Sequence, residues 1–500
     1  DSATAYSTVA ADKLVSGAEF EAGRNSLAVV GSTDIAVAEK ALAKTGYVIA
    51  KTGENAVNSA MLVLGQKDSS GAAVSIEGKA YATGSDSATV TGSFTNGTKS
   101  GSLMIIDVAS LGTGSNAVFE KDFDNAGTLY LANVKAGDTV KITEGALTGS
   151  GDFESDADRI LSVAQIAEGS STLTVRIDND KVDNFAGLST IDAIVGMYEA
   201  GAYDSKSGQF NYWLMDSDNG LTNAQVVAIG NDAAKLGATS AVASVTMDAV
   251  SAFNDSVAAR TTVLAPRAEG VTVWADVMGG HYEAKELMDG QGYKSDVYGG
   301  VLGVDSVVNG YTLGAAFTVA TADTDSTNTL VASSTDSDFV GFSVYGAKAF
   351  GQFNVAADLG YMKGSNDVSV KAYNLGDFSA DTSAFTAGVR GEVLVDAGSF
   401  KVVPHAGLRF THLTTDDFEA AYTTEIDSMN VFQMPVGVTV TGNVEAAGWN
   451  VAPMLDLSVV PAFGDTDADM TLGINGVATT TALSTQVIDS NLFQMKLGVA

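Results

Sequence analysis

The sequence predicts an all-β protein in which a parallel β-helix precedes one pore helix and an antiparallel transmembrane β-barrel. Three observations predict this architecture. Long segments near the C-terminus alternate strictly between apolar and polar residues, the turns between them are alternately short and long, and a strand-like phrase recurs through the first 220 residues.

The alternation is clearest at residues 432–440, which read F-Q-M-P-V-G-V-T-V. The apolar side chains fall on one face and the polar or small ones on the other, as in a strand with two different environments. Residues 400–411, 449–459 and 493–499 repeat the pattern, and their polar faces carry Lys401, His405, Arg409, Asp456 and Lys496. Such side chains on the inner face of otherwise apolar strands are typical of a membrane barrel with a polar lumen.

Ten strands can be placed, at about 271–282, 296–307, 311–321, 337–349, 352–363, 382–395, 399–413, 428–442, 446–460 and 487–500. Every second connection is short, namely 309–310, 351, 396–398 and 442–445. The others are mostly long, polar and acidic, such as 322–336 and 364–381. Membrane barrels sort their loops in this way, whereas a soluble β-sandwich, the alternative, does not. The prolines Pro404, Pro435 and Pro453 oppose this assignment, because a proline inside a central strand removes a hydrogen-bond donor.

Three stretches of the C-terminal half occur in an informative order. They are V-T-V-W-A-D-V-M-G-G at 271–280, F-Q-M-P-V-G-V at 432–438 and G-W-N-V-A-P-M-L-D-L-S-V-V-P at 448–461. In this order they resemble an autotransporter (type V secretion) translocator domain, over about residues 225–500. The resemblance implies a twelve-stranded barrel, an α-helix through its pore, and an upstream passenger carried to the cell surface. The chain departs from the family because it shows ten strands and lacks the terminal aromatic residue. We therefore expect it to be truncated at its C-terminus.

Residues 222–260 have a helical pattern, and residues 239–260 are mostly Ala, Ser, Val and Thr. These residues would span about 33 Å as a helix, close to the thickness of a bilayer core. Their small side chains suit the bore of a barrel of intermediate size. The alternative is an amphipathic helix on a domain surface. Some family members cut themselves beside an Asn pair, but here the pair is Asn254-Asp255, so self-cleavage is not expected.

The N-terminal phrases are N-S-L-A-V (25–29), G-S-L-M-I (101–105), G-T-L-Y-L (127–131) and S-T-L-T-V (171–175), and residues 94–96 match residues 123–125. One strand per repeat, with Asn and Gly at the turns, predicts stacked rungs with Leu103, Leu129 and Leu173 pointing inward. Any β protein rich in Gly, Ser and Val could yield such phrases. Residues 35–42 could be a short helix or an unusual rung, and residues 188–203 contain a candidate helix.

Composition limits the function. The chain has 27 Lys and Arg against 60 Asp and Glu, a net charge of −33, which argues against binding nucleic acid through phosphates. It has no cysteine, so disulfides and thiol nucleophiles are excluded. No apolar run is long enough for a membrane helix. The first 30 residues show no signal peptide, so we expect the sequence to be a fragment.

Candidate sites are few. Residues 178–184 and 216–220 carry several Asp and Asn but lack the spacing and closing Glu of an EF-hand loop, so we interpret them as solvated turns. The histidines are His281, His405 and His412, so the first 280 residues hold no Ser–His pair and no histidine metal motif. The sequence predicts no catalytic, cofactor-binding or metal site.

Several aromatic and charged residues have expected positions in the barrel. His405 and Arg409 should line the lumen beside acidic groups. Trp274, Trp449 and Tyr361 should lie near the membrane interfaces, where aromatic side chains are enriched.

These observations divide the chain into a passenger fragment (1–220), a linker with the pore helix (221–265) and a translocator barrel (266–500). We expect the barrel in the bacterial outer membrane and the passenger outside the cell. The resemblance implies contact with outer-membrane lipid, with the barrel-assembly machinery and with periplasmic chaperones. We expect an adhesin-like, non-enzymatic passenger with a host or surface ligand. The alternatives are a porin-like channel with an N-terminal domain, or a surface enzyme whose catalytic part lies upstream.

Overall fold

The computed structural model describes four short strands before residue 122 and most of residues 122–499. The gaps in this second range are residues 126–127, 133, 135, 156–160, 168, 266–268, 289, 399, 443 and 447–448. The predicted helix or rung at residues 35–42 lies outside the described residues. The chain forms two compact units. Unit 1 contains Asp1–Ala186, Ile194–Tyr203 and Met215–Asn223, and unit 2 contains Gly187–Ala193, Asp204–Leu214 and Ala224–Ala500.

Parallel pairing dominates the early strands of unit 1. One parallel sheet has the order β2-β1-β4-β6-β9, with β1 (Leu27–Val30), β2 (Met61–Leu64), β4 (Leu103–Asp107), β6 (Thr128–Ala132) and β9 (Asp152–Ser155). A second has the order β3-β5-β8, with β3 (Phe94–Asn96), β5 (Phe123–Asn125) and β8 (Leu147–Thr148). Phe94 pairs with Phe123 and Leu27 with Leu103, as the repeated phrases predict. A complete β-helix remains a prediction.

Asn125 shows how an asparagine stabilises the edge of such a rung. Its side chain is fully buried, and Nδ2 donates to the backbone oxygen of Asp152 at 3.1 Å. Gly149 lies against it at a positive φ of 100°, and a Cβ there would lie 2.1 Å from the Asn125 oxygen. Only glycine fits this close approach.

The predicted parallel solenoid is wrong at its C-terminal end. The strands β7 (Thr139–Lys141), β10 (Ser162–Ile166) and β11 (Thr172–Ile177) form an antiparallel sheet. The connection between β10 and β11 is too short for the crossover that parallel strands need. Leu129 and Leu173 are buried as predicted, but Leu173 lies in this antiparallel sheet. The register of β4 and β6 is shifted by one residue from the predicted alignment, because Leu103 pairs with Thr128 and not with Leu129.

Short helices follow the antiparallel sheet. They are α3 (Asn179–Asp183), α4 (Ile191–Ala200), α5 (Lys206–Leu214), the 3-10 turn η2 (Ser217–Asn219), α6 (Asn223–Ala234) and α7 (Leu236–Thr239). The candidate helix within residues 188–203 is confirmed by α4. Asp178 caps α3 and Asp216 caps η2, each accepting a hydrogen bond from the backbone N–H two residues on. These aspartates therefore stabilise helix ends.

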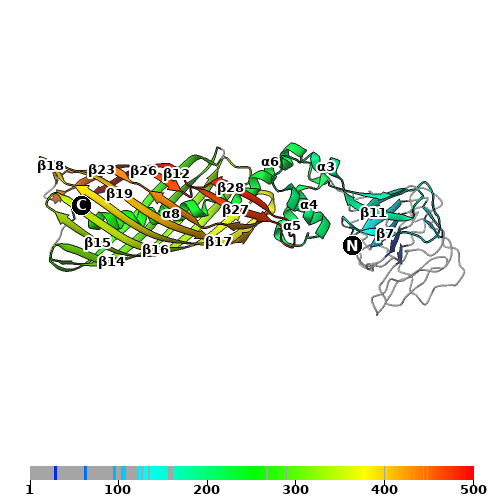
Figure 1. Cartoon of the computed structure of the whole chain (residues 1–500), viewed down its shortest axis with the longest axis horizontal. Helices are drawn as coiled ribbons and strands as arrows, with labels where there is room; N and C mark the ends of the chain where they lie inside the picture. The colour runs from blue at the N-terminus through cyan, green and yellow to red at the C-terminus, as the bar shows by residue number, and fades with distance from the viewer. Residues whose placement is uncertain are drawn as a thin grey trace, which may run out of the picture. The chain divides into compact units, whose positions relative to one another are not determined.

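A large antiparallel sheet in unit 2 curls around helix α8 (Val242–Thr261; Figure 1). Its strand segments are β12 (Gly270–Met288), β13 (Gln291–Val308), β14 (Tyr311–Thr327), β15 (Ser333–Phe350), β16 (Phe353–Val370), β17 (Gly376–Val393), β18 (Val395–Ala397), β19 (Phe400–Thr415), β22 (Met429–Gln433), β23 (Val436–Gly442), β26 (Pro453–Gly464) and β29 (Asn491–Val499). Because β17 with β18 and β22 with β23 each make one crossing, these twelve segments form the ten predicted crossings. Within the described residues β12 pairs with β13 and β29 with β26, but β12 and β29 do not pair, so the barrel is open there.

Alternation along these strands separates an apolar exterior from a polar interior, as predicted. One row of outward aromatic residues crosses four neighbouring strands in register, through Phe317, Phe342, Tyr361 and Phe385. A second exposed group lies toward the short turns, with Tyr311, Phe350, Phe353 and Phe400. Two aromatic rows around an apolar band are the pattern of a barrel in a bilayer.

The two ends of the barrel differ. The long-loop end carries the connections 328–332, 371–375, 416–428 and 465–490. The short-turn end carries 309–310, 351–352, 398–399 and the small hairpin of β24 (Val444–Ala446) and β25 (Trp449–Val451). The long loops predicted at 322–336 and 364–381 are wrong, because β14 to β17 continue through most of them. Outward Asp and Ser alternate there with buried Ala322, Val368 and Phe378, which is strand alternation above the apolar band.

The three prolines occupy positions that need no ladder donor. Pro453 is the first residue of β26, and Pro435 lies in the break between β22 and β23. Pro404 lies in β19 opposite the interruption between β17 and β18. Strand starts and irregular positions are where prolines are tolerated in sheets.

A second, smaller sheet lies at the long-loop end. It is built from the two longest connections and has the order β20-β21-β27-β28, with β20 (Phe418–Glu419), β21 (Thr423–Ile426), β27 (Asp467–Gly473) and β28 (Thr481–Gln486). Gly237 of α7 packs against Met470, Ile426 and Thr424 of this sheet. A Cβ at Gly237 would lie 3.0 Å from the Met470 sulfur, so the glycine permits a close approach.

Candidate functional site: the helix in the barrel lumen

Helix α8 begins three residues later than predicted because Ala241 adopts a left-handed conformation, with φ 58°, between α7 and α8. Of the described helices, Leu236–Thr261 alone is long and apolar enough to cross a membrane, yet nearly all of its most apolar part is buried inside the protein. Helix α8 packs against β12 to β17 and β19. It therefore fills the barrel and does not face lipid.

The largest side chain of α8 has a matching space in the wall. Phe253 is 2 % exposed and lies against Gly341 of β15. A Cβ at Gly341 would lie 2.8 Å from Thr318 and 3.4 Å from the Phe253 ring. The remaining side chains of the helix are mostly small, which lets ten strands approach it.

Hydroxyl groups tie the start of α8 to the wall. The Thr246 and Thr382 hydroxyls lie 2.8 Å apart, and Thr335 donates to the backbone oxygen of Ser240 at 2.8 Å. The Ser244 hydroxyl donates to the backbone oxygen of Val487. Residues 382, 335 and 487 lie toward the long-loop end, so the N-terminus of α8 points to that end.

The middle of α8 carries two aspartates with different partners. Asp248 is 7 % exposed and accepts a hydrogen bond from the Tyr293 hydroxyl at 2.9 Å. Asp255 forms an ion pair with Lys496 of β29 at 2.6 Å. One turn earlier, Gln494 Nε2 donates to the Ser251 hydroxyl at 3.1 Å. The last strand of the sheet is therefore attached to the helix at two points.

Arg260 anchors the other end of α8. Its guanidinium donates twice to Asp305 of β13, at 2.6 and 2.9 Å. The Tyr345 hydroxyl also donates to Asp305 at 3.0 Å, and Trp274 Nε1 donates to Tyr345 at 2.7 Å. A bidentate Arg–carboxylate pair is strong and directional.

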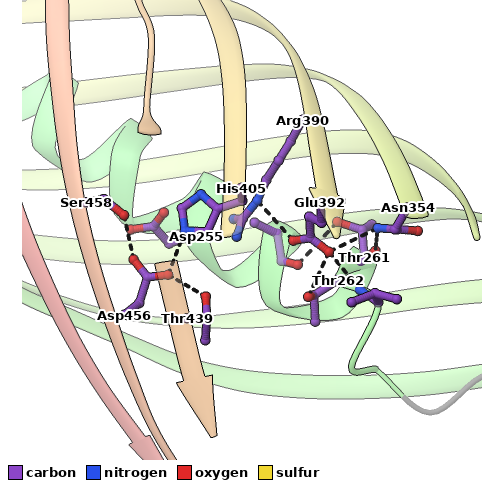
Figure 2. A network of polar contacts seen from close by, with 12 residues as sticks. Asp255, Thr261, Thr262, Asn354, Arg390, Glu392, His405, Thr439, Asp456 and Ser458 are labelled. Carbon is purple, nitrogen blue, oxygen red and sulfur yellow. Dashed lines mark hydrogen bonds and ion pairs between the residues drawn. The ribbon is translucent and has the colours of Figure 1, made fainter. Parts of the chain in front are cut away.

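Glu392 forms hydrogen bonds with the residues that directly follow helix α8 (Figure 2). Its Oε2 accepts from the Thr262 hydroxyl at 2.9 Å, from the Val263 N–H at 2.8 Å and from Asn354 at 3.2 Å. Arg390 forms an ion pair with its other oxygen at 3.0 Å. Asn354 also donates to the backbone oxygen of Thr261 at 2.9 Å. This network satisfies backbone groups at the helix terminus.

The second network in Figure 2 joins strands of the wall. His405 Nε2 lies 2.8 Å from Asp456, which also accepts from Thr439 at 2.5 Å and from Ser458 at 2.6 Å. His405 and Ser458 both bond to Asp456, so they are not arranged as a base and its nucleophile. The His405 bond joins β19 to β26 and the Thr439 bond joins β23 to β26, whereas Ser458 lies in β26 with Asp456.

The predicted lumen positions of His405 and Arg409 are confirmed. Arg409 makes two hydrogen bonds to Asp358, at 2.8 and 2.9 Å, across Gly388. The other two histidines face outward, with His281 beside Asp296 and His412 beside Asn430.

The aromatic residues have mixed outcomes. Tyr361 lies in the outward aromatic row, in agreement with the prediction. The placement of Trp274 at the membrane interface is wrong for its side chain, which faces the lumen because the alternation of β12 puts it beside Gly303 and Tyr345. The side chain of Trp449 lies outside the described residues. Asn254 is buried in the middle of α8, and cleavage beside it remains untested.

The sequence prediction missed Asp305, Glu392 and Arg260. The sequence pattern could have identified Glu392. This residue pairs with His405 in the neighbouring strand, so its side chain lies on the same lumen face. Asp305 likewise lies on the face that alternation within β13 assigns to the interior. No sequence pattern specified which wall residue would meet Arg260.

The comparisons with known proteins found one matching family and a set of similar solved structures. The autotransporter beta-domain family matches residues 273–500. No curated protein matches the sequence. Among solved structures, the β domain of the Bordetella autotransporter BrkA is 15 % identical, with a TM-score of 0.34, covering 46 % of this chain and 93 % of that chain. The translocator domain of the autotransporter NalP from Neisseria meningitidis is 15 % identical, with a TM-score of 0.36, covering 50 % of this chain and 96 % of that chain. Residues 273–500 therefore belong to the autotransporter β-domain family, whose barrels lie in the bacterial outer membrane and export the passenger that precedes them.

Proposed function

We propose that this protein carries its own N-terminal passenger through the outer membrane and displays it as an adhesin-like surface module. The observation that supports this most directly is the course of α8. The helix fills the lumen, its N-terminus lies at the long-loop end, and Arg260 and Glu392 hold its C-terminus at the short-turn end. Short turns face the periplasm in bacterial barrels, so the upstream chain leaves on the cell exterior.

A binding role for the passenger is favoured over an enzymatic one. The three histidines all follow residue 280, and the chain has no cysteine. The common nucleophile and base pairs therefore have no candidates in residues 1–220. Parallel strands stacked along one direction instead offer an extended face for a host or surface ligand.

The partners of the barrel follow from its surface. The outward aromatic rows and the apolar band between them would contact outer-membrane lipid. Insertion of such a barrel requires assembly machinery in general, and we propose the barrel-assembly complex and periplasmic chaperones for this chain.

The absence of cysteine supplies a direct test, because each introduced cysteine is the unique thiol of the chain. Three exposed positions report the topology: Ser150 in unit 1, Leu330 at the long-loop end and Gln352 at the short-turn end. We expect a membrane-impermeant maleimide to label Ser150→Cys and Leu330→Cys on intact cells. Gln352→Cys should react only after the outer membrane is permeabilised.

Other outcomes would contradict the proposal. Protection of Ser150→Cys together with labelling of Leu330→Cys would show a barrel that retains its N-terminal part inside. Labelling of Gln352→Cys on intact cells would reverse the orientation. A porin-like channel would in addition conduct ions in a planar bilayer with α8 in place, whereas we expect α8 to block conductance.

A further inference from the structure

The small sheet at the long-loop end holds a segment that precedes the pore helix by about thirty residues. We name Asp204–Leu214 the latch segment, and β20, β21, β27 and β28 with their connections the receptor sheet. The latch segment belongs to the same compact unit as the barrel, although the residues on either side of it belong to unit 1. The chain thus returns to the barrel at this point.

The start of helix α5, within the latch segment, meets a carboxylate of the receptor sheet. Glu419 Oε1 accepts hydrogen bonds from the Ser207 N–H at 3.1 Å and the Ser207 hydroxyl at 2.7 Å. The Ser207 hydroxyl accepts in turn from the Asn475 N–H at 3.1 Å. A carboxylate at a helix N-terminus satisfies free N–H groups and interacts well with the helix dipole. Burial alone would raise the pKa of Glu419, but the hydrogen bonds from Ser207, Asn475 and Ser205 together outweigh it and leave the pKa lowered.

One turn further along α5, the buried side-chain amide of Asn211 forms a hydrogen bond with the backbone of the receptor sheet. Asn211 is fully buried, and its Nδ2 donates to the Ala421 oxygen and to the Ser207 oxygen, both at 2.8 Å. Beside it, the Tyr422 hydroxyl lies 2.7 Å from that of Thr190, which precedes the latch segment, and the Tyr422 ring packs edge-on against Phe210 of the segment. Buried polar groups such as these are costly without their partners. The receptor sheet is therefore shaped for this segment.

The aromatic end of the latch segment meets a strained loop. The Trp213 and Tyr373 rings lie 5.3 Å apart, and Tyr373 and Asn374 have positive φ values of 53° and 57°. Non-glycine residues rarely adopt this conformation, and such strain is concentrated at ligand clamps and functional sites. The contact between the two rings suggests that the strained conformation of this loop positions Tyr373 against Trp213.

Helix α5 would be marginal without the sheet. It has nine residues, fewer than an isolated helix needs for stability in water. Its buried face mixes Phe210 and Leu214 with the polar Ser207 and Asn211, and the hydrogen bonds of these two residues to Glu419 and Ala421 form only against the receptor sheet.

We propose that the receptor sheet is a latch that captures Asp204–Leu214 once this segment has left the pore and prevents the exported chain from sliding back. This inference rests on the proposed export of the passenger. The position of the segment fits, because residues nearest to α8 are the first to reach the outside when the chain leaves at the long-loop end. Docking then opposes return through the lumen before the rest of the passenger has crossed.

Amide hydrogen exchange on the purified full chain tests the docking itself. Asn211→Ala and Glu419→Gln remove receptor contacts, and Gln209→Ala, on the exposed face of the same helix, is the matched control. We expect each docking variant to accelerate exchange in residues 206–214 by about tenfold or more, the effect of losing one to two buried hydrogen bonds. Gln209→Ala should leave this exchange unchanged, and exchange in β13 to β16 should stay slow in all variants.

A time course of surface labelling at Ser150→Cys tests the export step. We expect Asn211→Ala and Glu419→Gln to slow the appearance of label while the amount of folded barrel stays constant. Fast exchange of residues 206–214 in the parent chain, or labelling kinetics equal to those of Gln209→Ala, would overturn the latch. Failure to label Ser150→Cys in the parent chain would instead contradict export, and the exchange result would then show docking without that role.

Discussion

Replacing Arg260 with methionine should destabilise the barrel strongly, because it leaves the buried carboxylate of Asp305 without its charged partner. The side chain of Asp305 is completely buried, and that of Arg260 is 17 % exposed. Methionine keeps most of the apolar contacts of the arginine stem but removes both guanidinium hydrogen bonds. Asp305 would then keep one side-chain donor among the described residues, the hydroxyl of Tyr345.

The expected magnitude follows from that burial. Removing one partner of a buried ion pair typically costs about 3–5 kcal/mol, because the other charge stays desolvated. The Asp255–Lys496 pair is the matched comparison, since both side chains are 31 % exposed. Lys496→Met should cost at most about 1 kcal/mol, as for pairs that water still reaches.

A double substitution separates the charge from the packing. If the cost arises from an unpaired carboxylate, Arg260→Met with Asp305→Leu should recover most of the loss, because apolar replacement of a whole buried pair is often neutral. Tyr345 limits this recovery, since its hydroxyl loses Asp305 as an acceptor. The coupling between the two sites gives the pair energy directly.

The measurement is reversible chemical unfolding of the chain folded in detergent micelles, followed by tryptophan fluorescence. Trp274 donates to Tyr345 in the same network, so it reports on the site. A free energy of unfolding for Arg260→Met within about 1 kcal/mol of the parent, the range of surface pairs, would refute the reasoning. An equal loss for Lys496→Met would show that burial does not set the cost.

Three further predictions test other parts of the structure. Gly341→Val should destabilise the barrel by about 1–3 kcal/mol in the same unfolding assay, because the added methyl groups overpack the space beside Phe253. Val389→Arg, on the apolar exterior, should cost about 2–4 kcal/mol on folding into lipid vesicles, whereas Ser379→Arg, above the aromatic row on the same strand, should cost about 0–1 kcal/mol. Leu129→Ala should destabilise unit 1 by about 2–5 kcal/mol, since Leu129 is fully buried, and thermal unfolding followed by circular dichroism would check this.

The barrel could be predicted because alternation is a strong local signal. A period of two fixes the face of every residue once one is known. Assigning His405 to the lumen therefore also assigned Arg409, and the pairing of β19 with β17 then places Glu392 there. The number of crossings followed from the same pattern.

The predictions were wrong where both faces of a strand meet polar surroundings, or where tertiary contacts determine the local structure. Above the apolar band the outward side of β14 to β17 is hydrated, so aspartates and serines there resemble loop residues although the strands continue. The antiparallel sheet containing Leu173 depends on the short connection before it, which the repeated phrases did not weigh. The break before α8 depends on a left-handed Ala241, which no intrinsic preference favours.

The contacts of α8 have a consequence for the open side of the barrel. Strands β12 and β29 border a cavity of about 1240 Å³ that α8 lines through Asp255, Ser256 and Arg260. On one side of this opening Lys496 ties β29 to Asp255, and on the other Arg260 ties the helix to Asp305 of β13. The helix is thus a brace between two strands that do not pair with each other in the described residues. Weakening the Lys496 pair should therefore loosen β29, and weakening the Arg260 pair should loosen β13, before the continuous sheet from β14 to β17.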